Sequence, residues 1–297
     1  MKKKIIYLFL FAFVFRFVLA FLVWHPDVRN HVDWAIRFWD YGPRKFYTAN
    51  VWSFTWPNQP PGTVYLFAGI YKLYMAVFSF FWNINVKIPL FPSNIVTILE
   101  ERGLQAFLQL PAILADLGIA YLIYRIFKKK QKLAVLGATI FLFNPIIWYN
   151  SSVWGQTDAV INFFAILAFL SLLERKLIWA TLSLVISFYI KASLLIYVPI
   201  FAIIVFKQKY KLIEIIKSLA ISILVISLLT LPFSGGEPFS WLFELYQKKI
   251  FVNQLQVITA NAFNLWAALT GIHEQPHSLL LGPLSYQVWG ILLFGIS

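Results

Sequence analysis

The sequence predicts an all-α fold, a polytopic bundle of transmembrane helices, and two observations predict it. The first is composition: 60% of the 297 residues are hydrophobic and only 12% are charged, whereas about 25% of the residues in a soluble domain are charged. The second is that the basic residues gather in short runs between long apolar stretches, as they do in the cytoplasmic loops of membrane proteins. Lipid must therefore be the solvent for much of the chain.

The crossings are predicted from apolar stretches near the length that spans a hydrocarbon core, roughly 17–25 residues. They lie at residues 5–24, 104–127, 133–150, 158–173, 177–190, 192–206, 211–232 and 279–297. The basic runs, at residues 2–4, 125–132, 175–176 and 207–211, then all fall on one side of the membrane. We therefore expect a multi-pass protein with a cytoplasmic N-terminus, in the plasma membrane if the protein is prokaryotic.

The apolar stretch at residues 62–82 is expected to lie on the outer surface of the membrane. Counting it as a crossing would put residues 128–130, which are all lysine, on the outside, against the distribution of basic residues in membrane proteins. Its tyrosine and tryptophan side chains suit an interfacial or re-entrant helix.

The whole chain, residues 1–297, is predicted to be a single membrane domain. Its long first external loop, residues 25–103, would hold juxtamembrane helices and the catalytic segment, and a second external segment would cover residues 233–278. Loops of this length are usually functional. The chain ends inside an apolar run at Ser297, so we expect a natural short form or a fragment that lacks the C-terminal part of a longer domain.

Several function classes are disfavoured by composition and by missing motifs. The net charge of +13 would suggest nucleic-acid binding in a soluble protein, but membrane topology explains where the basic residues lie. The chain has no cysteine, which excludes disulfides and thiolate metal sites. It has no glycine-rich phosphate loop, zinc-protease motif or dinucleotide fingerprint, so a phosphate-linked donor would be a lipid.

Asp27 is the candidate for acid–base chemistry, because it follows a proline at the edge of the first helix, where partial desolvation can tune a carboxylate. The same position suits a solvated loop residue equally well. Asp33 and Asp40 are seven residues apart and would share a helix face with Arg37. We expect these three residues to form solvated or paired charges on an interfacial helix.

Two polar positions between apolar stretches are candidates for binding. Gln156 and Asp158 lie at the outer membrane edge, where ionisable residues are often functional, although a plain polar loop would look the same. Lys191 interrupts an apolar run and could neutralise a phosphate where two short helices meet, or extend its ammonium group to the interface. Asn261, Asn264 and Trp266 suit sugar recognition, and they suit an interfacial helix as well.

In their order along the chain, these segments resemble motifs of the GT-C superfamily of polyprenyl-phosphate-sugar-dependent glycosyltransferases, above all its glucosyl- and mannosyltransferases. The residues that carry the resemblance are Asp27 with Trp34, then Gln59, Pro60 and Pro61, Arg102 and Gly103, Asp116, the segment 154–158, Lys191 with Tyr197 and Pro199, and the segment 260–266. At position 58 the chain has Asn where some relatives have Asp. Full-length relatives are longer.

The resemblance implies a GT-C-like membrane bundle that transfers a hexose, with inversion, on the non-cytoplasmic side. Asp27 would be the general base on the acceptor hydroxyl, and Lys191 and Arg102 would hold the phosphate of the donor. The sugar or the acceptor would contact Trp34, Gln156, Asp158, Asn261, Asn264 and Trp266.

The expected partners are a polyprenyl-phosphate sugar donor, a glycan, lipid or protein acceptor, and membrane lipid. No cofactor is expected, and a lone carboxylate without a clear second ligand argues against a required metal ion. Two alternatives stay open, a transporter or flippase of lipid-linked sugars and a non-catalytic membrane subunit. A transporter often shows internal repeats, and none is visible in the sequence.

Overall fold

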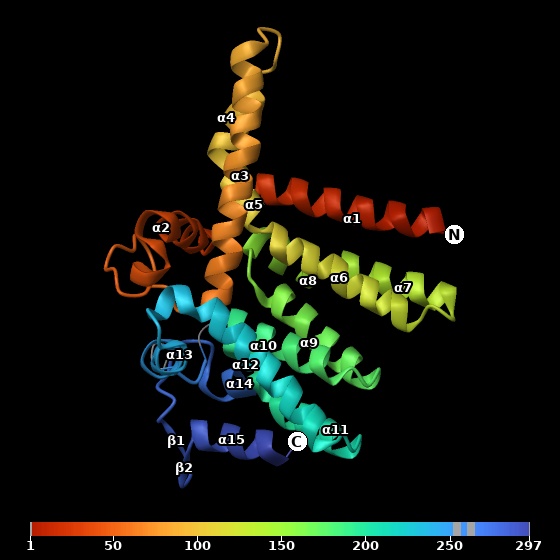
Figure 1. Ribbon diagram of the computed structural model, residues 1–297, viewed down its shortest axis with the longest axis vertical. Coiled ribbons are helices and arrows are strands. Elements are labelled where there is room, and N and C mark those ends of the chain that lie inside the picture. Colours follow the sequence, from red (N-terminus) through yellow and green to blue (C-terminus); the bar gives the residue numbers. More distant parts are fainter. Residues whose placement is uncertain (1, 252–256, 260–264, 297) are drawn as a thin grey trace. The chain divides into compact units, whose positions relative to one another are not determined.

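The computed structural model describes residues 2–251, 257–259 and 265–296. Contacts within the chain divide it into two compact units, Met1–Leu245 and Tyr246–Ser297, and each is described here by itself. Figure 1 labels the elements of both units. The single membrane domain expected over residues 1–297 stays a prediction.

The predicted all-α fold is confirmed, because the first unit is built of helices alone in the residues that the structure describes. Most are α-helices, but η1 and η2 are π-helical turns and η3 is a 3₁₀ helix. In chain order they are α1 (Lys2–Leu22), α2 (Val28–Phe46), α3 (Pro61–Lys87), α4 (Asn94–Ile98), η1 (Leu99–Gly103), α5 (Leu104–Leu108), α6 (Leu110–Ile126), α7 (Gln131–Phe143), α8 (Pro145–Tyr149), η2 (Asn150–Trp154), α9 (Asp158–Leu173), α10 (Leu177–Ile190), η3 (Ala192–Tyr197), α11 (Val198–Lys207), α12 (Leu212–Ser234) and α13 (Pro238–Leu245).

The second unit begins with the π-helical turn η4 (Tyr246–Phe251) and contains α14 (Leu265–Thr270), β1 (Leu280–Leu281), β2 (Leu284–Ser285) and α15 (Tyr286–Ile296). The two strands pair antiparallel around a turn in which Gly282 has a φ of +66°. The stretch at residues 279–297, predicted as one crossing, is instead a hairpin followed by α15 in the residues that the structure describes.

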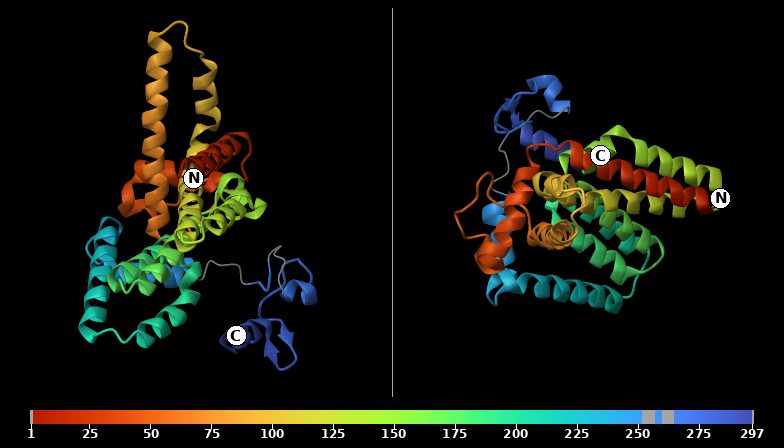
Figure 2. Two further views of the ribbon diagram at one scale, coloured as in Figure 1. Left: turned by 90° about the vertical axis from the view of Figure 1, so that its right-hand side faces the viewer. Right: turned by 90° about the horizontal axis from the view of Figure 1, so that it is seen from above.

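The helices of the first unit form a bundle in which α1, α6 and α7 run side by side, with α9, α10 and α12 beside them (Figures 1 and 2). Small residues sit at the contacts: Ala12, Ala120 and Ala138 are fully buried where α1, α6 and α7 meet. Small side chains let helix backbones approach closely, as is common in membranes. Many large apolar side chains face outward instead, which suits contact with lipid.

Among the residues that the structure describes, three helices are long and apolar enough to cross a membrane: α1 over Ile5–Leu22, α3 and α12. Two bent pairs would raise the number to five. The predicted crossing at 104–127 bends by 46° at Gln109, and the one at 133–150 bends by 48° at Asn144. Pro145 directly follows Asn144, whose backbone is extended, as is usual before proline. Pro111 lies in the first turn of α6 and has no N–H with which to continue the hydrogen bonds of α5.

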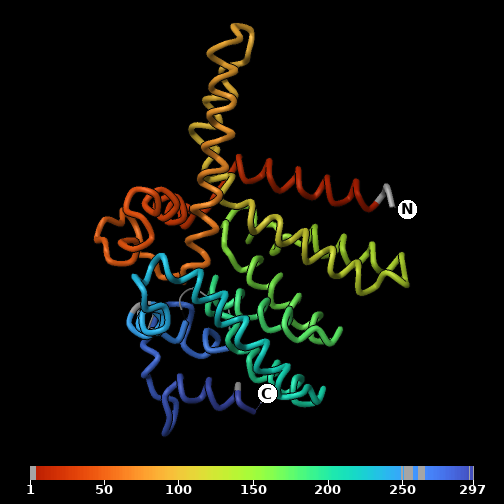
Figure 3. Tube along the Cα trace, in the orientation of Figure 1, coloured from red at the N-terminus to blue at the C-terminus, as the bar shows by residue number. Residues whose placement is uncertain are grey.

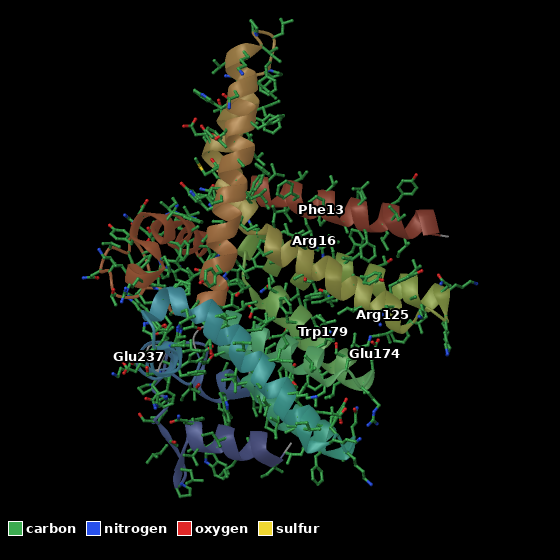
Figure 4. All side chains as sticks on the ribbon, in the orientation of Figure 1. Phe13, Arg16, Arg125, Glu174, Trp179 and Glu237 are labelled. Carbon is green, nitrogen blue, oxygen red and sulfur yellow. The ribbon has the colours of Figure 1, made fainter. Side chains whose placement is uncertain are left out.

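The basic turns lie together at one end of the bundle. Arg125, at the end of α6, forms an ion pair with Glu174 in the α9–α10 turn, and Figure 4 labels both residues there. Arg175 donates a hydrogen bond to the backbone carbonyl of Gln208 in the α11–α12 turn, over 3.0 Å. The N-terminus lies at the same end (Figure 3). The basic turns therefore lie on one side of the bundle, as the basic runs in the sequence predict. That this side is cytoplasmic stays a prediction.

Helix α3 contains the stretch expected to lie on the membrane surface. It runs across the ends of α1 and α6, not alongside them (Figures 1 and 2). Its length and hydropathy would allow it to cross a membrane. Its direction relative to the bundle suits the surface placement, which stays a prediction.

Candidate functional site

Asp27 lies between α1 and α2 and is fixed by the last residue of η2 and the segment that follows it. Its Oδ2 atom accepts hydrogen bonds from the indole Nε1–H of Trp154, at 2.7 Å, and from Nε2 of Gln156, at 3.2 Å. Its Oδ1 atom lies 3.4 Å from Nδ1 of His25, and the side chain is 40% exposed. The carboxylate is therefore held in place by two hydrogen-bond donors and is still accessible to a ligand.

Gly155 allows Trp154 and Gln156 to reach Asp27. Its backbone is left-handed, with φ +69° and ψ +27°, a conformation that glycine adopts without the cost of a Cβ. A Cβ atom there would also meet Val28 at 3.0 Å. The π-helical turn and this glycine together direct both donors back to the start of α2.

The second polar pair joins Lys191 to Asp158. Lys191 stands at the break after α10, where the backbone is extended, and its Nζ lies 2.9 and 3.1 Å from the two carboxylate oxygens of Asp158. Asp158 is the first residue of α9. The side chains are 20% and 35% exposed, so the pair is only partly removed from solvent.

The start of α3 holds the break beside Lys191 in place. The hydroxyl of Thr63 donates a 2.6 Å hydrogen bond to the carbonyl oxygen of Ile190. A Cβ atom on Gly62 would lie 2.5 Å from the carbonyl oxygen of Tyr189, so only glycine fits. The close approach explains why a proline-rich turn ends in glycine here.

His31, on α2, connects the two pairs electrostatically. Burial lowers the pKa of His31 to about 4, while the nearby charge of Asp27 raises it and that of Lys191 lowers it. Its ring stacks on Phe67 with centroids 4.3 Å apart, and its buried Nδ1 has no hydrogen-bond partner among the described residues. Both charged side chains therefore act on the same buried ring.

A groove of about 590 Å³ leads away from Asp158 between α6, α7, α9 and α11. Its polar lining residues are Asp116, Asn150, Asp158, Asn162 and Tyr197, and its apolar ones are Ile119, Phe141, Ile146, Ile147, Ala159, Ala165, Ile166, Phe169 and Ile200. The volume is typical of a small-molecule site, roughly 300–1,000 Å³. Apolar walls and a polar end suit a lipid chain with a polar headgroup.

Arg16 and Asp116 form a buried ion pair in the bundle. Nε of Arg16 lies 3.6 Å from Oδ2 of Asp116, and the side chains are 0% and 3% exposed. One arginine amino group also donates to the carbonyl of Leu142 over 2.5 Å. Figure 4 labels Arg16 on α1, facing α6.

The other predicted site residues have different surroundings. The indole N–H of Trp34 donates to the carbonyl of Thr55 at 2.9 Å, which ties α2 to the following loop. Arg102 donates to the carbonyls of Phe21 and Leu22 at the end of α1. The structure thus joins Asp27 to Gln156 and Asp158 to Lys191, while Trp34 and Arg102 make structural contacts.

Three predicted residues belong to the second unit. Trp266 lies on α14 and packs edge-on against Tyr286, with ring centroids 5.4 Å apart. Asn261 and Asn264 lie outside the described residues. Their role in recognising a sugar stays a prediction.

Two residues of the candidate site, Trp154 and His31, were not predicted from the sequence. Trp154 belongs to the segment 154–158, but its position in the sequence does not indicate that its indole N–H donates a hydrogen bond to Asp27. The proximity of His31 to Asp27 could have been predicted, because His31 follows Asp27 by four residues and α2 begins between them. Residues at that spacing share a helix face.

No group of three or more His, Cys, Asp or Glu side chains suited to a metal occurs in the described part of the chain. The expectations of no metal and no cofactor stay predictions. The carboxylates that the structure describes are instead matched with cations or hydrogen-bond donors at Asp27, Asp116 and Asp158.

Comparison with known proteins gives one match. The family model described as GPI transamidase subunit PIG-U matches residues 85–289, more than half of the chain. No curated protein and no solved structure matches. The matched region includes Asp158 and Lys191 and begins after Asp27.

This match corrects the function predicted from the sequence. The family is described as a subunit of a transamidase, not as a lipid-sugar hexosyltransferase, so the predicted inverting glycosyltransferase activity is wrong. The match does not support a polyprenyl-phosphate sugar donor, and membership of the GT-C glycosyltransferases is not confirmed. The predicted integral, multi-pass membrane protein is confirmed. The chain belongs to the GPI transamidase subunit PIG-U family.

Proposed function

We propose that this chain is a non-catalytic membrane subunit of an assembly of the GPI transamidase type, and that it holds the lipid-anchor substrate for a partner subunit. The family match supports the subunit role. It also favours protein partners and a lipid-anchor substrate within the membrane. We place the N-terminus and the basic turns in the cytoplasm, because basic loops are retained there, and the candidate site on the other side.

The groove beside Asp158 is the observation that carries the lipid-binding role. A GPI lipid has apolar chains and a glycan headgroup joined through phosphate, so it needs an apolar wall that ends among polar groups. Both kinds of side chain line the groove, and along α9 the polar Asp158 and Asn162 precede the apolar Ile166 and Phe169. The ammonium group and the carboxylate of the Lys191–Asp158 pair supply a donor and acceptors to the hydroxyl groups of a glycan.

Asp27 is placed to bind a hydroxyl group of a ligand. Its Oδ2 atom accepts hydrogen bonds from Trp154 and Gln156, and the side chain is 40% exposed. A carboxylate held in this way is well suited to accept a third hydrogen bond from a ligand hydroxyl.

Photolabelling tests the groove directly. The full chain in nanodiscs would be exposed to a photoactivatable phosphatidylinositol that carries a glucosamine headgroup. Ile200→Trp places a large ring in the groove, and Ile203→Trp places the same ring on the same helix, away from the groove; the two native side chains are 50% and 54% exposed. We expect labelling to fall about tenfold, roughly 1.4 kcal/mol, only in Ile200→Trp. Equal labelling of both variants would contradict the lipid-binding role.

The activity of the assembly tests the non-catalytic role. Cells that depend on the Asp27→Asn chain would be assayed for attachment of a reporter protein to its lipid anchor at saturating lipid. We expect the rate to fall by less than tenfold, since loss of a general base typically costs about 10²–10⁴. A loss of a hundredfold or more in a correctly assembled complex would place Asp27 in catalysis and reject the proposal.

A further inference from the structure

A second cavity lies at the opposite end of α10 from Lys191. It has a volume of about 470 Å³ and is formed by the α9–α10 turn, the start of α10 and the first turns of α12. Its charged and aromatic lining residues are Arg175, Lys176, Trp179, Tyr210, Glu214 and Lys217. Neither the family match nor the groove beside Asp158 accounts for it.

The cavity has an excess of positive charge, because three basic side chains and one carboxylate, that of Glu214, line it. Lys176 forms an ion pair with Glu174, which also pairs with Arg125. In the part of the chain that the structure describes, the side chains of Arg175 and Lys217 form no ion pair. The cations therefore suit an anion from outside the chain.

The backbone of Arg175, whose guanidinium lines the cavity, is strained. Arg175 has a φ of +59° just after the end of α9, a position where glycine is usual. A residue with a side chain is strained in this conformation, because its Cβ approaches the following carbonyl oxygen. Its guanidinium nevertheless donates to Gln208 and lies 5.4 Å from the centre of the Tyr210 ring, so it is held in a fixed position. Such outliers gather at functional sites.

The surroundings of the cavity favour a membrane lipid over a soluble anion. Trp179 is 64% exposed, and tryptophan is enriched where the hydrocarbon core meets the headgroups. Leu177 also lines an adjacent apolar cavity of about 330 Å³ between α10, α11 and α12, with Phe201 and Leu219. A basic cavity and an apolar one therefore share a wall.

We propose that Arg175 and Lys217 bind the phosphate of an anionic phospholipid at this end of the bundle, with an acyl chain in the adjacent apolar cavity. Basic pockets between transmembrane helices bind anionic headgroups on the cytoplasmic side of membranes. The site is separate from the groove of the proposed function, so either proposal can fail alone.

The test is lipid titration of the purified full chain, read as the shift in melting temperature. Separate samples would receive phosphatidic acid, phosphatidylcholine and inorganic phosphate. We expect saturable stabilisation by phosphatidic acid at concentrations at least tenfold below those of the other two. Equal stabilisation by phosphatidylcholine would overturn the charge argument, and equal stabilisation by inorganic phosphate would assign the cavity to a soluble anion.

Two pairs of variants locate the effect. Lys217→Gln removes a cation that forms no ion pair among the described residues, and Lys132→Gln removes an exposed lysine from another turn at the same end. Arg175→Gly keeps the left-handed backbone, and Lys209→Gly makes the matching change at φ +54° outside the cavity. Affinity for phosphatidic acid should fall about tenfold in Lys217→Gln and Arg175→Gly only. Equal affinities within each pair would overturn the proposal.

Discussion

The ammonium nitrogen of Lys191 lies within hydrogen-bond distance of both carboxylate oxygens of Asp158. The contact joins the end of α10 to the first residue of α9, so the ion pair lies beside the groove that Asp158 lines. Because both side chains are partly exposed, water screens the attraction between them, and the pair contributes only modestly to stability.

A double-mutant cycle should measure that contribution. Lys191→Met leaves Asp158 without its cation, and Asp158→Asn leaves Lys191 without its anion, so each lowers the melting temperature. The double variant should lose less stability than the sum of the losses in the two single variants, with a coupling free energy of roughly 1 kcal/mol. Thermal unfolding in detergent at two salt concentrations provides the measurement. Strictly additive losses would show that the two charges do not interact.

Gly62→Ala should destabilise the protein. The added Cβ would lie 2.5 Å from a backbone carbonyl oxygen of Tyr189, which cannot rotate away as a side chain can. We expect a cost of about 1–3 kcal/mol, typical of overpacking, measured by chemical unfolding. Gly69→Ala is the matched control on the same helix, because nothing lies within 4 Å of its added Cβ. Similar behaviour of both variants would contradict the close approach.

His31 should make stability depend on pH between about 6.5 and 4. Burial lowers the pKa of His31 in the folded protein to about 4, below its value of roughly 6.5 in the unfolded chain. The unfolded chain binds the proton first, so the stabilisation is complete above pH 6.5 and is lost as the pH falls to 4. The loss is about 3 kcal/mol by linkage.

Unfolding of His31→Phe over the same pH range checks this. Phenylalanine can keep the stack on Phe67 and does not titrate, so the slope should flatten. His25→Phe is the control, since His25 is partly exposed. An unchanged slope in His31→Phe would assign the pH dependence to other groups.

Asp116→Ala should cost far more than Glu174→Gln. The first leaves Arg16 buried without its anion, which typically costs about 3–5 kcal/mol. The second removes an exposed pair with Arg125, which contributes little to stability because water screens the attraction. Arg16→Leu combined with Asp116→Ala should recover much of the loss, and unfolding in the same detergent compares all three. A small cost for Asp116→Ala would mean that water reaches Arg16.

The membrane bundle and its basic end could be predicted because both depend on properties summed along the chain, hydropathy and charge. The bends at Gln109 and Asn144 could not be placed by hydropathy, which does not change there. The prolines at 111 and 145 were the available signal. The hairpin around Gly282 was missed for the same reason, because its leucines resemble those of a crossing.

The candidate site was predictable residue by residue but not as an arrangement. Asp27, Gln156, Asp158 and Lys191 stand out as polar groups at the ends of apolar stretches. Their pairing depends on how α1, α9 and α10 pack against one another, and a local sequence pattern contains no information about that packing. The activity was misread because a shared order of motifs indicates a kind of membrane bundle, whereas function depends on the chemistry of a site.

The short helices around the groove have a consequence for the surrounding bilayer. The helices α9 and α10 have 16 and 14 residues, or about 24 and 21 Å at a rise of ~1.5 Å per residue. A hydrocarbon core is about 30 Å thick, so a bilayer that these helices cross has to be thinner beside them. Such a mismatch favours thinner membranes, and it brings the headgroups of neighbouring lipids closer to the groove.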